Sequence, residues 1–181
     1  MIWLILGLLL WAGAHFFKRL APAARARMGK AGKAAVALVL LLALYLMIEG
    51  YQAAPADPLY SSPAWLRGIN NLLMLFSVYL FAVSGAKTAL HRYTRHPMLW
   101  GTVVWASAHL LVNGDLPSLV LFGGLLAWAL AEMVVINRSE PDWQPPAPRG
   151  RAAEIRAVVI ALVVYALIAG IHTWLGYFPF G

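Results

Sequence analysis

The sequence contains no cysteine among its 181 residues. This absence excludes disulfide bonds, a thiolate nucleophile, thiolate ligation of haem and cysteine-ligated iron–sulfur clusters. Charged residues are also scarce, at 12% of the chain, whereas an ordinary soluble domain has about 25%. The chain further lacks Walker, GxSxG and HExxH motifs and any zinc-ligand spacing. The sequence therefore gives no support to the common nucleotide-binding, serine-hydrolase or zinc-enzyme classes.

Apolar sequence is abundant instead: 62% of the residues are hydrophobic and the mean hydropathy is +0.73. Apolar segments of about 17–25 residues are long enough to cross a bilayer as helices. Segments of about this length lie at 2–17, 34–51, 67–86, 97–112, 117–136 and 156–177. We therefore predict an all-α fold, a polytopic membrane helix bundle of about six transmembrane helices that forms a single domain over residues 1–181.

The positive charges predict the orientation of these helices. All of the 14 Lys and Arg residues except Arg67 lie in or beside the loops that follow the first, third and fifth apolar segments. Cytoplasmic loops of membrane proteins carry an excess of Lys and Arg. The first segment is not a signal peptide, because its positive charge follows the apolar run. We predict a multi-pass protein of the bacterial inner membrane with both termini in the periplasm.

The net charge of +7 does not indicate a nucleic-acid-binding protein. A nucleic-acid surface gathers its basic residues on one folded face, whereas here they are spread over three short loops. Basic loops beside membrane helices attract anionic lipid headgroups. The expected partner is therefore membrane lipid, with no nucleic acid.

The histidines are the strongest candidates for a functional site. Ionisable side chains are costly inside a membrane and mark functional sites there. Matching their depths along straight helices pairs His15 with His96 near the inner side, and His109 with His172 near the outer side. Imidazole is a common ligand of haem and transition metals, so two facing histidines would hold one haem. The alternative is a set of structural histidines, each bonded to a carbonyl or placed at the interface.

Residues around His109 form its predicted support. A basic cluster that includes Arg95 and His96 precedes the fourth segment, and an Asn113-Gly114-Asp115 turn follows it. Asn113 lies one helical turn beyond His109 and is predicted to orient its ring, although the turn also serves simply to join two helices. Glu132 is expected to pair with Arg95 or Arg138.

The motif Arg-His-Pro-Met-Leu-Trp-Gly…Ala-His-Leu-Leu-Val-Asn-Gly-Asp-Leu over residues 95–116 resembles the signature of the NnrU family of bacterial membrane proteins. Shorter similar stretches occur near His15, at 63–67 and at 121–129, so the resemblance covers nearly the whole chain. Val103 departs from the lysine expected in relatives. The family is associated with nitrite and nitric oxide reduction in denitrifying bacteria.

The same sequence also looks related to the 15-cis-ζ-carotene isomerases, membrane enzymes that hold haem b through histidines. This resemblance implies His109 and His15 as ligands to the metal of haem b, whereas depth matching pairs His109 with His172, which is a further candidate. It also implies a haem-dependent cis–trans isomerase acting on an apolar polyene. An activity does not follow from membership of a family alone.

Two other functions remain open from the sequence. One is a non-catalytic membrane partner that assembles or stabilises a respiratory reductase. The other is an S-adenosylmethionine-dependent membrane methyltransferase, because Arg95-His96-Pro97-x-x-x-Gly101 also resembles a motif of those enzymes. Here the acidic pair expected downstream is incomplete, since Met133 follows Glu132.

Overall fold

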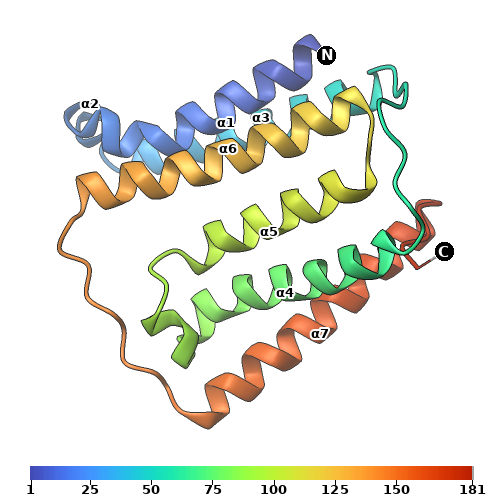
Figure 1. Cartoon of the computed structure of the whole chain (residues 1–181). Helices are drawn as coiled ribbons and strands as arrows, with labels where there is room; N and C mark the ends of the chain where they lie inside the picture. Colours follow the sequence, from blue (N-terminus) through green and yellow to red (C-terminus); the bar gives the residue numbers. More distant parts are fainter. Residues whose placement is uncertain (181) are drawn as a thin grey trace. The chain divides into compact units, whose positions relative to one another are not determined.

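The computed structural model describes residues 1–180, which form helices and connecting loops with no β-strand (Figure 1). In chain order the elements are α1 (Ile2–Leu20), α2 (Pro22–Arg27), α3 (Ala31–Gln52), α4 (Leu66–Ala86), the short 3-10 helix η1 (Ala89–Arg92), α5 (Pro97–Val112), α6 (Leu116–Ser139) and α7 (Arg151–Trp174).

Each of the six apolar segments predicted from the sequence forms one helix. Five of these helices (α1, α3, α4, α6 and α7) are long and apolar enough to cross a membrane by length and composition, and α5 is a shorter apolar helix of 16 residues. The prediction of an all-α membrane helix bundle is therefore confirmed. α2 and η1 were not predicted from the sequence. They have six and four residues, which is too short for a periodic pattern of apolar residues.

The helices group into two compact units, and each unit is built from two separate stretches of chain. The first unit comprises residues 1–60 and 113–141 and contains α1, α2, α3 and α6. The second comprises residues 61–112 and 142–181 and contains α4, η1, α5 and α7. Whether the two act as the single domain predicted from the sequence stays untested.

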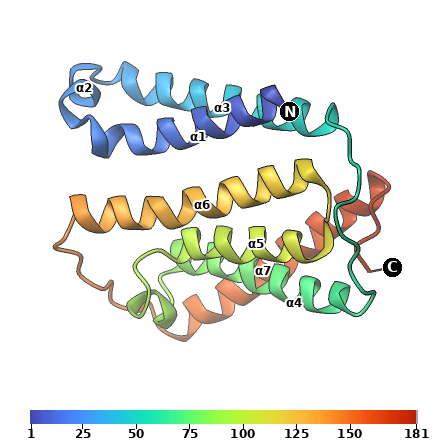
Figure 2. The same ribbon diagram turned by 45° about the horizontal axis from the view of Figure 1, so that its top comes forward.

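In the first unit α1 packs against both α3 and α6 (Figure 2). Glycines make the α1–α3 contact close: a Cβ added at Gly7 would lie 2.7 Å from Cγ of Met47, and one at Gly50 would lie 2.7 Å from Cα of Leu4. Leu4 is fully buried in this contact, at 0% exposure. Small residues allow membrane helices to approach closely, which is how this pair is held without polar contacts.

In the second unit α4 packs against both α5 and α7. The buried Ser77 hydroxyl of α4 donates a hydrogen bond of 2.8 Å to the carbonyl of Gly101 in α5. Gly101 also allows the Phe81 ring to approach, because an added Cβ would lie 3.0 Å from the ring. α4 thus supports both α5, which carries His109, and α7, which carries His172.

Candidate functional site

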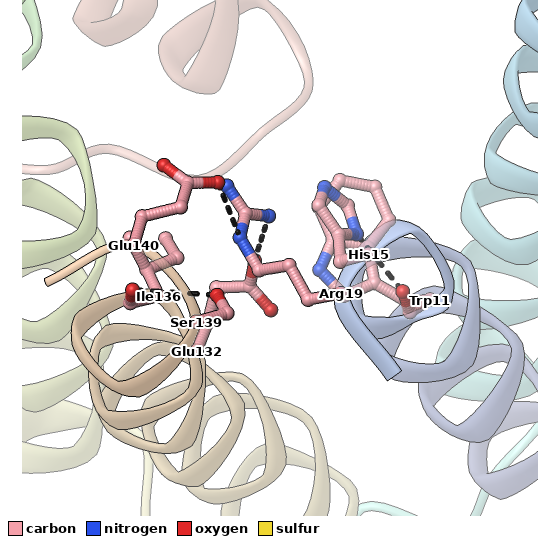
Figure 3. A network of polar contacts seen from close by, with 7 residues as sticks. All are labelled: Trp11, His15, Arg19, Glu132, Ile136, Ser139 and Glu140. Carbon is pink, nitrogen blue, oxygen red and sulfur yellow. Dashed lines mark hydrogen bonds and ion pairs between the residues drawn. The ribbon is translucent and has the colours of Figure 1, made fainter. Parts of the chain in front are cut away.

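A charged network links the end of α1 to the end of α6 in the first unit (Figure 3). Nη1 of Arg19 donates a hydrogen bond of 2.9 Å to Oε1 of Glu132, and Nε of Arg19 lies 3.4 Å from Oε1 of Glu140. Glu132 is buried, with 3% of its surface exposed. A buried carboxylate is stabilised by a paired cation, and Arg19 provides one for Glu132.

Arg19 was not among the partners predicted for Glu132 from the sequence. The predicted pairing of Glu132 with Arg95 or Arg138 stays a prediction, whereas Arg19 lies 113 residues away in the sequence. One signal was available: Arg19 and Glu132 both lie within the last two turns of helices whose ends were assigned to the cytoplasmic side.

His15 lies one turn before Arg19 on α1 and is held by an aromatic cluster. Its Nδ1 lies 2.9 Å from the carbonyl oxygen of Trp11, so Nδ1 carries the proton and donates. The ring centroids of Trp11 and Trp128 lie 4.5 Å and 4.6 Å from that of His15. This arrangement leaves the lone pair of His15 on Nε2, the nitrogen that would bind a metal.

The indole N–H groups of the two tryptophans beside His15 lack hydrogen-bond acceptors among the described residues. The Nε1 atoms of Trp11 and Trp128 are buried and have no hydrogen-bond acceptor within the part of the chain that the structure describes. Buried donors in proteins are nearly always paired, so an acceptor from a bound group would complete this cluster.

His172 repeats the arrangement of His15 in the second unit. Its Nδ1 donates a hydrogen bond of 2.8 Å to the carbonyl of Ile168, one turn earlier on α7. The lone pair of His172 therefore also lies on Nε2. A histidine whose Nδ1 proton is fixed by a carbonyl has the tautomer and ring orientation that are typical of metal ligands.

His109 lies in the last turn of α5 and contacts Trp105, with ring centroids 5.2 Å apart in an edge-to-face arrangement. His109 and His172 both belong to the second unit. Their pairing, which depth matching predicts, stays a prediction. His15 belongs to the other unit, so its pairing with His109 or His96 stays a prediction.

A compact metal site made of protein groups alone is not present in the described residues. No group of three or more His, Asp or Glu side chains within residues 1–180 is arranged to hold a metal ion. Haem supplies four nitrogens itself and needs only one or two protein ligands. Haem binding through His15, His109 or His172 stays a prediction.

The Asn113-Gly114-Asp115 turn has a clear structural role. Oδ1 of Asp115 accepts a hydrogen bond of 2.8 Å from the backbone N–H of Ser118 and thereby caps α6, and its Oδ2 accepts one of 2.9 Å from the Ser118 hydroxyl. The Tyr60 hydroxyl donates to the Asn113 carbonyl at 3.0 Å. Burial and the nearby Asp115 carboxylate raise the pKa of Tyr60, so it stays a donor at neutral pH. The predicted effect of Asn113 on the His109 ring stays a prediction.

Arg95 and His96 lie at the start of α5, where both side chains are half-buried. The carbonyl of His96 accepts a hydrogen bond of 2.9 Å from the N–H of Trp100 in the first turn of the helix. Nearby in η1, burial and the positive charge of Lys87 lower the pKa of His91. None of these contacts tests the predicted supporting role of Arg95 and His96.

An apolar groove of about 580 Å³ lies between α4 and α7 of the second unit. Its lining is formed by apolar and aromatic side chains, namely Leu72, Leu73, Leu75, Phe76, Tyr79 and Val158. This volume is within the range of about 300–1,000 Å³ that is usual for small-molecule sites. A lipid chain or another apolar molecule is the kind of ligand that it would accept.

Comparison with known proteins gives one match. No curated protein and no solved structure matches the chain. The family model described as NnrU protein matches residues 3–179, which is nearly the whole chain. The match includes all three candidate histidines, and it confirms the resemblance seen in the sequence. The chain belongs to the NnrU protein family.

Proposed function

We propose that this NnrU family protein is a multi-pass protein of the bacterial inner membrane, with both termini in the periplasm, that binds haem b through intramembrane histidines. The haem would serve redox chemistry linked to nitrogen oxides, or the cis–trans isomerisation of a carotenoid-like polyene. Bound haem b supplies one-electron chemistry that the side chains of a cysteine-free chain cannot supply.

The observation that carries this proposal is the hydrogen bond that fixes the Nδ1 proton of His172 and leaves its Nε2 lone pair available, on the unit that also contains His109. His172 and His109 would be the ligands within this unit. His15 has the same carbonyl-fixed tautomer and the unsatisfied indole donors beside it, so it is the next candidate. The groove lined by Leu72 and Phe76 favours an apolar substrate over a polar one.

The test is an absorption spectrum of the detergent-purified protein, oxidised and then reduced with dithionite, after expression with a haem precursor. We expect a Soret band that shifts and sharpens on reduction. His109→Ala and His172→Ala should each lose most of the bound haem, and His15→Ala should show whether the other unit contributes. His91→Ala is the matched control, because His91 lies in η1 outside the apolar helices, and it should keep the wild-type spectrum.

A featureless spectrum with full haem supply would refute haem binding. Co-purification of a reductase subunit with that colourless protein would then support the assembly-partner function. Binding of S-adenosylmethionine that is lost in Arg95→Ala would support a methyltransferase.

A further inference from the structure

We propose that a cationic pocket at the α1–α2–α3 end of the first unit binds the phosphate of an anionic phospholipid. The pocket has a volume of about 350 Å³ and belongs to the first unit, whereas His109 and His172 belong to the second. Its wall combines basic and apolar side chains, namely Ala14, His15, Lys18, Arg19, Arg25, Lys33, Val36, Ala37 and Leu40. No carboxylate contributes to this wall.

The cations come from three successive elements. Lys18 lies in the last turn of α1, Arg25 in α2 and Lys33 in the first turn of α3. Figure 2 shows α2 connecting the adjoining ends of α1 and α3, which is why these side chains meet. The short connection between two membrane helices therefore gathers charges that a longer loop would spread out.

Three of these cations lack an acidic partner. Arg19 is occupied by Glu132 and Glu140, as described above. Within residues 1–180 no ion pair joins a carboxylate to Lys18, Arg25 or Lys33. Like charges that face one pocket repel each other, so the arrangement is stabilised by a bound anion.

The start of α3 adds to this positive field. Lys33 lies in the first turn of α3, and this turn contains no acidic residue. The N-terminus of a helix carries a partial positive charge, so cations there are unfavourable and an anion is favoured.

Arg25 is placed over this helix start by a glycine. Gly32 is buried, and a Cβ added there would lie 3.0 Å from the guanidinium carbon of Arg25 and 2.7 Å from Cβ of Met28. The absence of a side chain at Gly32 thus allows the guanidinium to fold back beside the pocket.

The apolar part of the wall selects a lipid over a free anion. Val36, Ala37 and Leu40 continue along α3 from Lys33 toward the centre of an apolar helix. A phospholipid would place its phosphate against the cations and an acyl chain along this face of α3. Cations at the ends of membrane helices reach the headgroup level in this way.

A second groove between α1 and α3 shows that the cations do not surround these two helices evenly. This groove, of about 310 Å³, shares Ala14 and Val36 with the cationic pocket but is otherwise lined by Leu9, Leu10, Gly13, Phe17, Met28, Ala35 and Val39. It contains no charged side chain. Only one of the two grooves is therefore suited to a headgroup.

The test compares two double variants of the full-length protein in phosphatidylcholine vesicles. Nitroxide-labelled phosphatidylglycerol and phosphatidylcholine are added separately, and electron paramagnetic resonance measures the fraction of each that the protein immobilises. Arg25→Gln/Lys33→Gln removes two cations from the pocket. Arg27→Gln/Lys30→Gln removes two cations from the same loop that do not line the pocket.

We expect the wild-type protein to prefer phosphatidylglycerol. The preference should fall by at least about fivefold in Arg25→Gln/Lys33→Gln, because a single lost basic contact at an anionic surface already gives about that factor, and it should change little in Arg27→Gln/Lys30→Gln. An equal fall in both variants, or no preference in the wild type, would refute a defined site. Displacement of the lipid by inorganic phosphate at constant ionic strength would show a free-phosphate site and would overturn the lipid assignment. Circular dichroism checks that both variants keep their helices.

Discussion

At the scale of single residues, Arg19 and Glu132 form the pair on which the first unit depends most directly. Arg19 joins α1 to α6 through a bond of 2.9 Å to a carboxylate that is 3% exposed. The energetic cost of losing one partner differs from the cost of losing both, because a lone buried charge is far less stable than no charge.

We predict that Arg19→Met lowers the free energy of unfolding by about 3 kcal/mol, because it leaves the buried Glu132 carboxylate without this cation. Glu132→Gln should cost only about 1 kcal/mol, since its amide oxygen still accepts from Arg19. Unfolding in detergent, followed by circular dichroism, measures both.

The double variant Arg19→Met/Glu132→Gln provides the decisive comparison. Its loss of unfolding free energy should be clearly smaller than the sum of the two single losses, because the buried carboxylate that Arg19 neutralises is absent from the double variant. Additive losses would show that the two residues act independently.

The histidines illustrate what the sequence can and cannot predict at this scale. Their presence within apolar segments made His15, His109 and His172 candidates without a structure. The Nδ1 bonds to the Trp11 and Ile168 carbonyls depend on rotamers, and the partner of Glu132 depends on packing across 113 residues. Neither is encoded in a local pattern.

At the scale of elements, glycine decides how closely helices approach. Gly7 and Gly13 both lie on α1, but only Gly7 faces α3 closely. A Cβ at Gly7 would lie 2.8 Å from the carbonyl oxygen of Ala43, whereas nothing lies within 4 Å of a Cβ at Gly13.

We therefore predict that Gly7→Ala destabilises the protein by about 1–3 kcal/mol, because backbone atoms of α3 must move. Gly13→Ala, in the same helix, should be neutral or stabilising by up to about 1 kcal/mol, because alanine favours helix more than glycine does. Thermal unfolding of both variants in detergent tests this difference. Equal effects would mean that Gly7 does not determine the α1–α3 spacing.

The element boundaries show which sequence signals were sufficient. The lengths of the apolar segments were sufficient to predict six helices. The Asn113-Gly114-Asp115 turn correctly indicated the start of α6, where Asp115 caps the helix. α2 has only six residues, so no periodic pattern could form in it. Its Pro22 at the first turn was the one local sign of a helix start.

At the scale of the whole molecule, the absence of cysteine makes the predicted topology directly measurable. Ala56→Cys places a single thiol in the loop between α3 and α4, and Ala147→Cys places one between α6 and α7. A membrane-impermeant thiol reagent applied to spheroplasts should label Ala56→Cys directly, and should label Ala147→Cys only after the membrane is opened. The reverse pattern would place both termini in the cytoplasm.

The division into two units could not be read from the sequence, because hydropathy locates helices but does not say which of them pack together. α6 packs with α1 and α3, although α4 and α5 lie between them in the sequence. Likewise, α7 packs with α4, although α5 and α6 come between them in the sequence. These choices depend on individual side chains such as Leu4, Gly50 and Arg19.

The interleaving of the two units has a consequence for how the protein is made. Because the first unit comprises residues 1–60 and 113–141, a ribosome must synthesise α4 and α5 before α6 exists to join α1. Arg19 is therefore synthesised before Glu132, and this ion pair cannot form until α6 has been made. A nascent chain that stops after α5 would leave both units unfinished, and it would be an early target for membrane proteases.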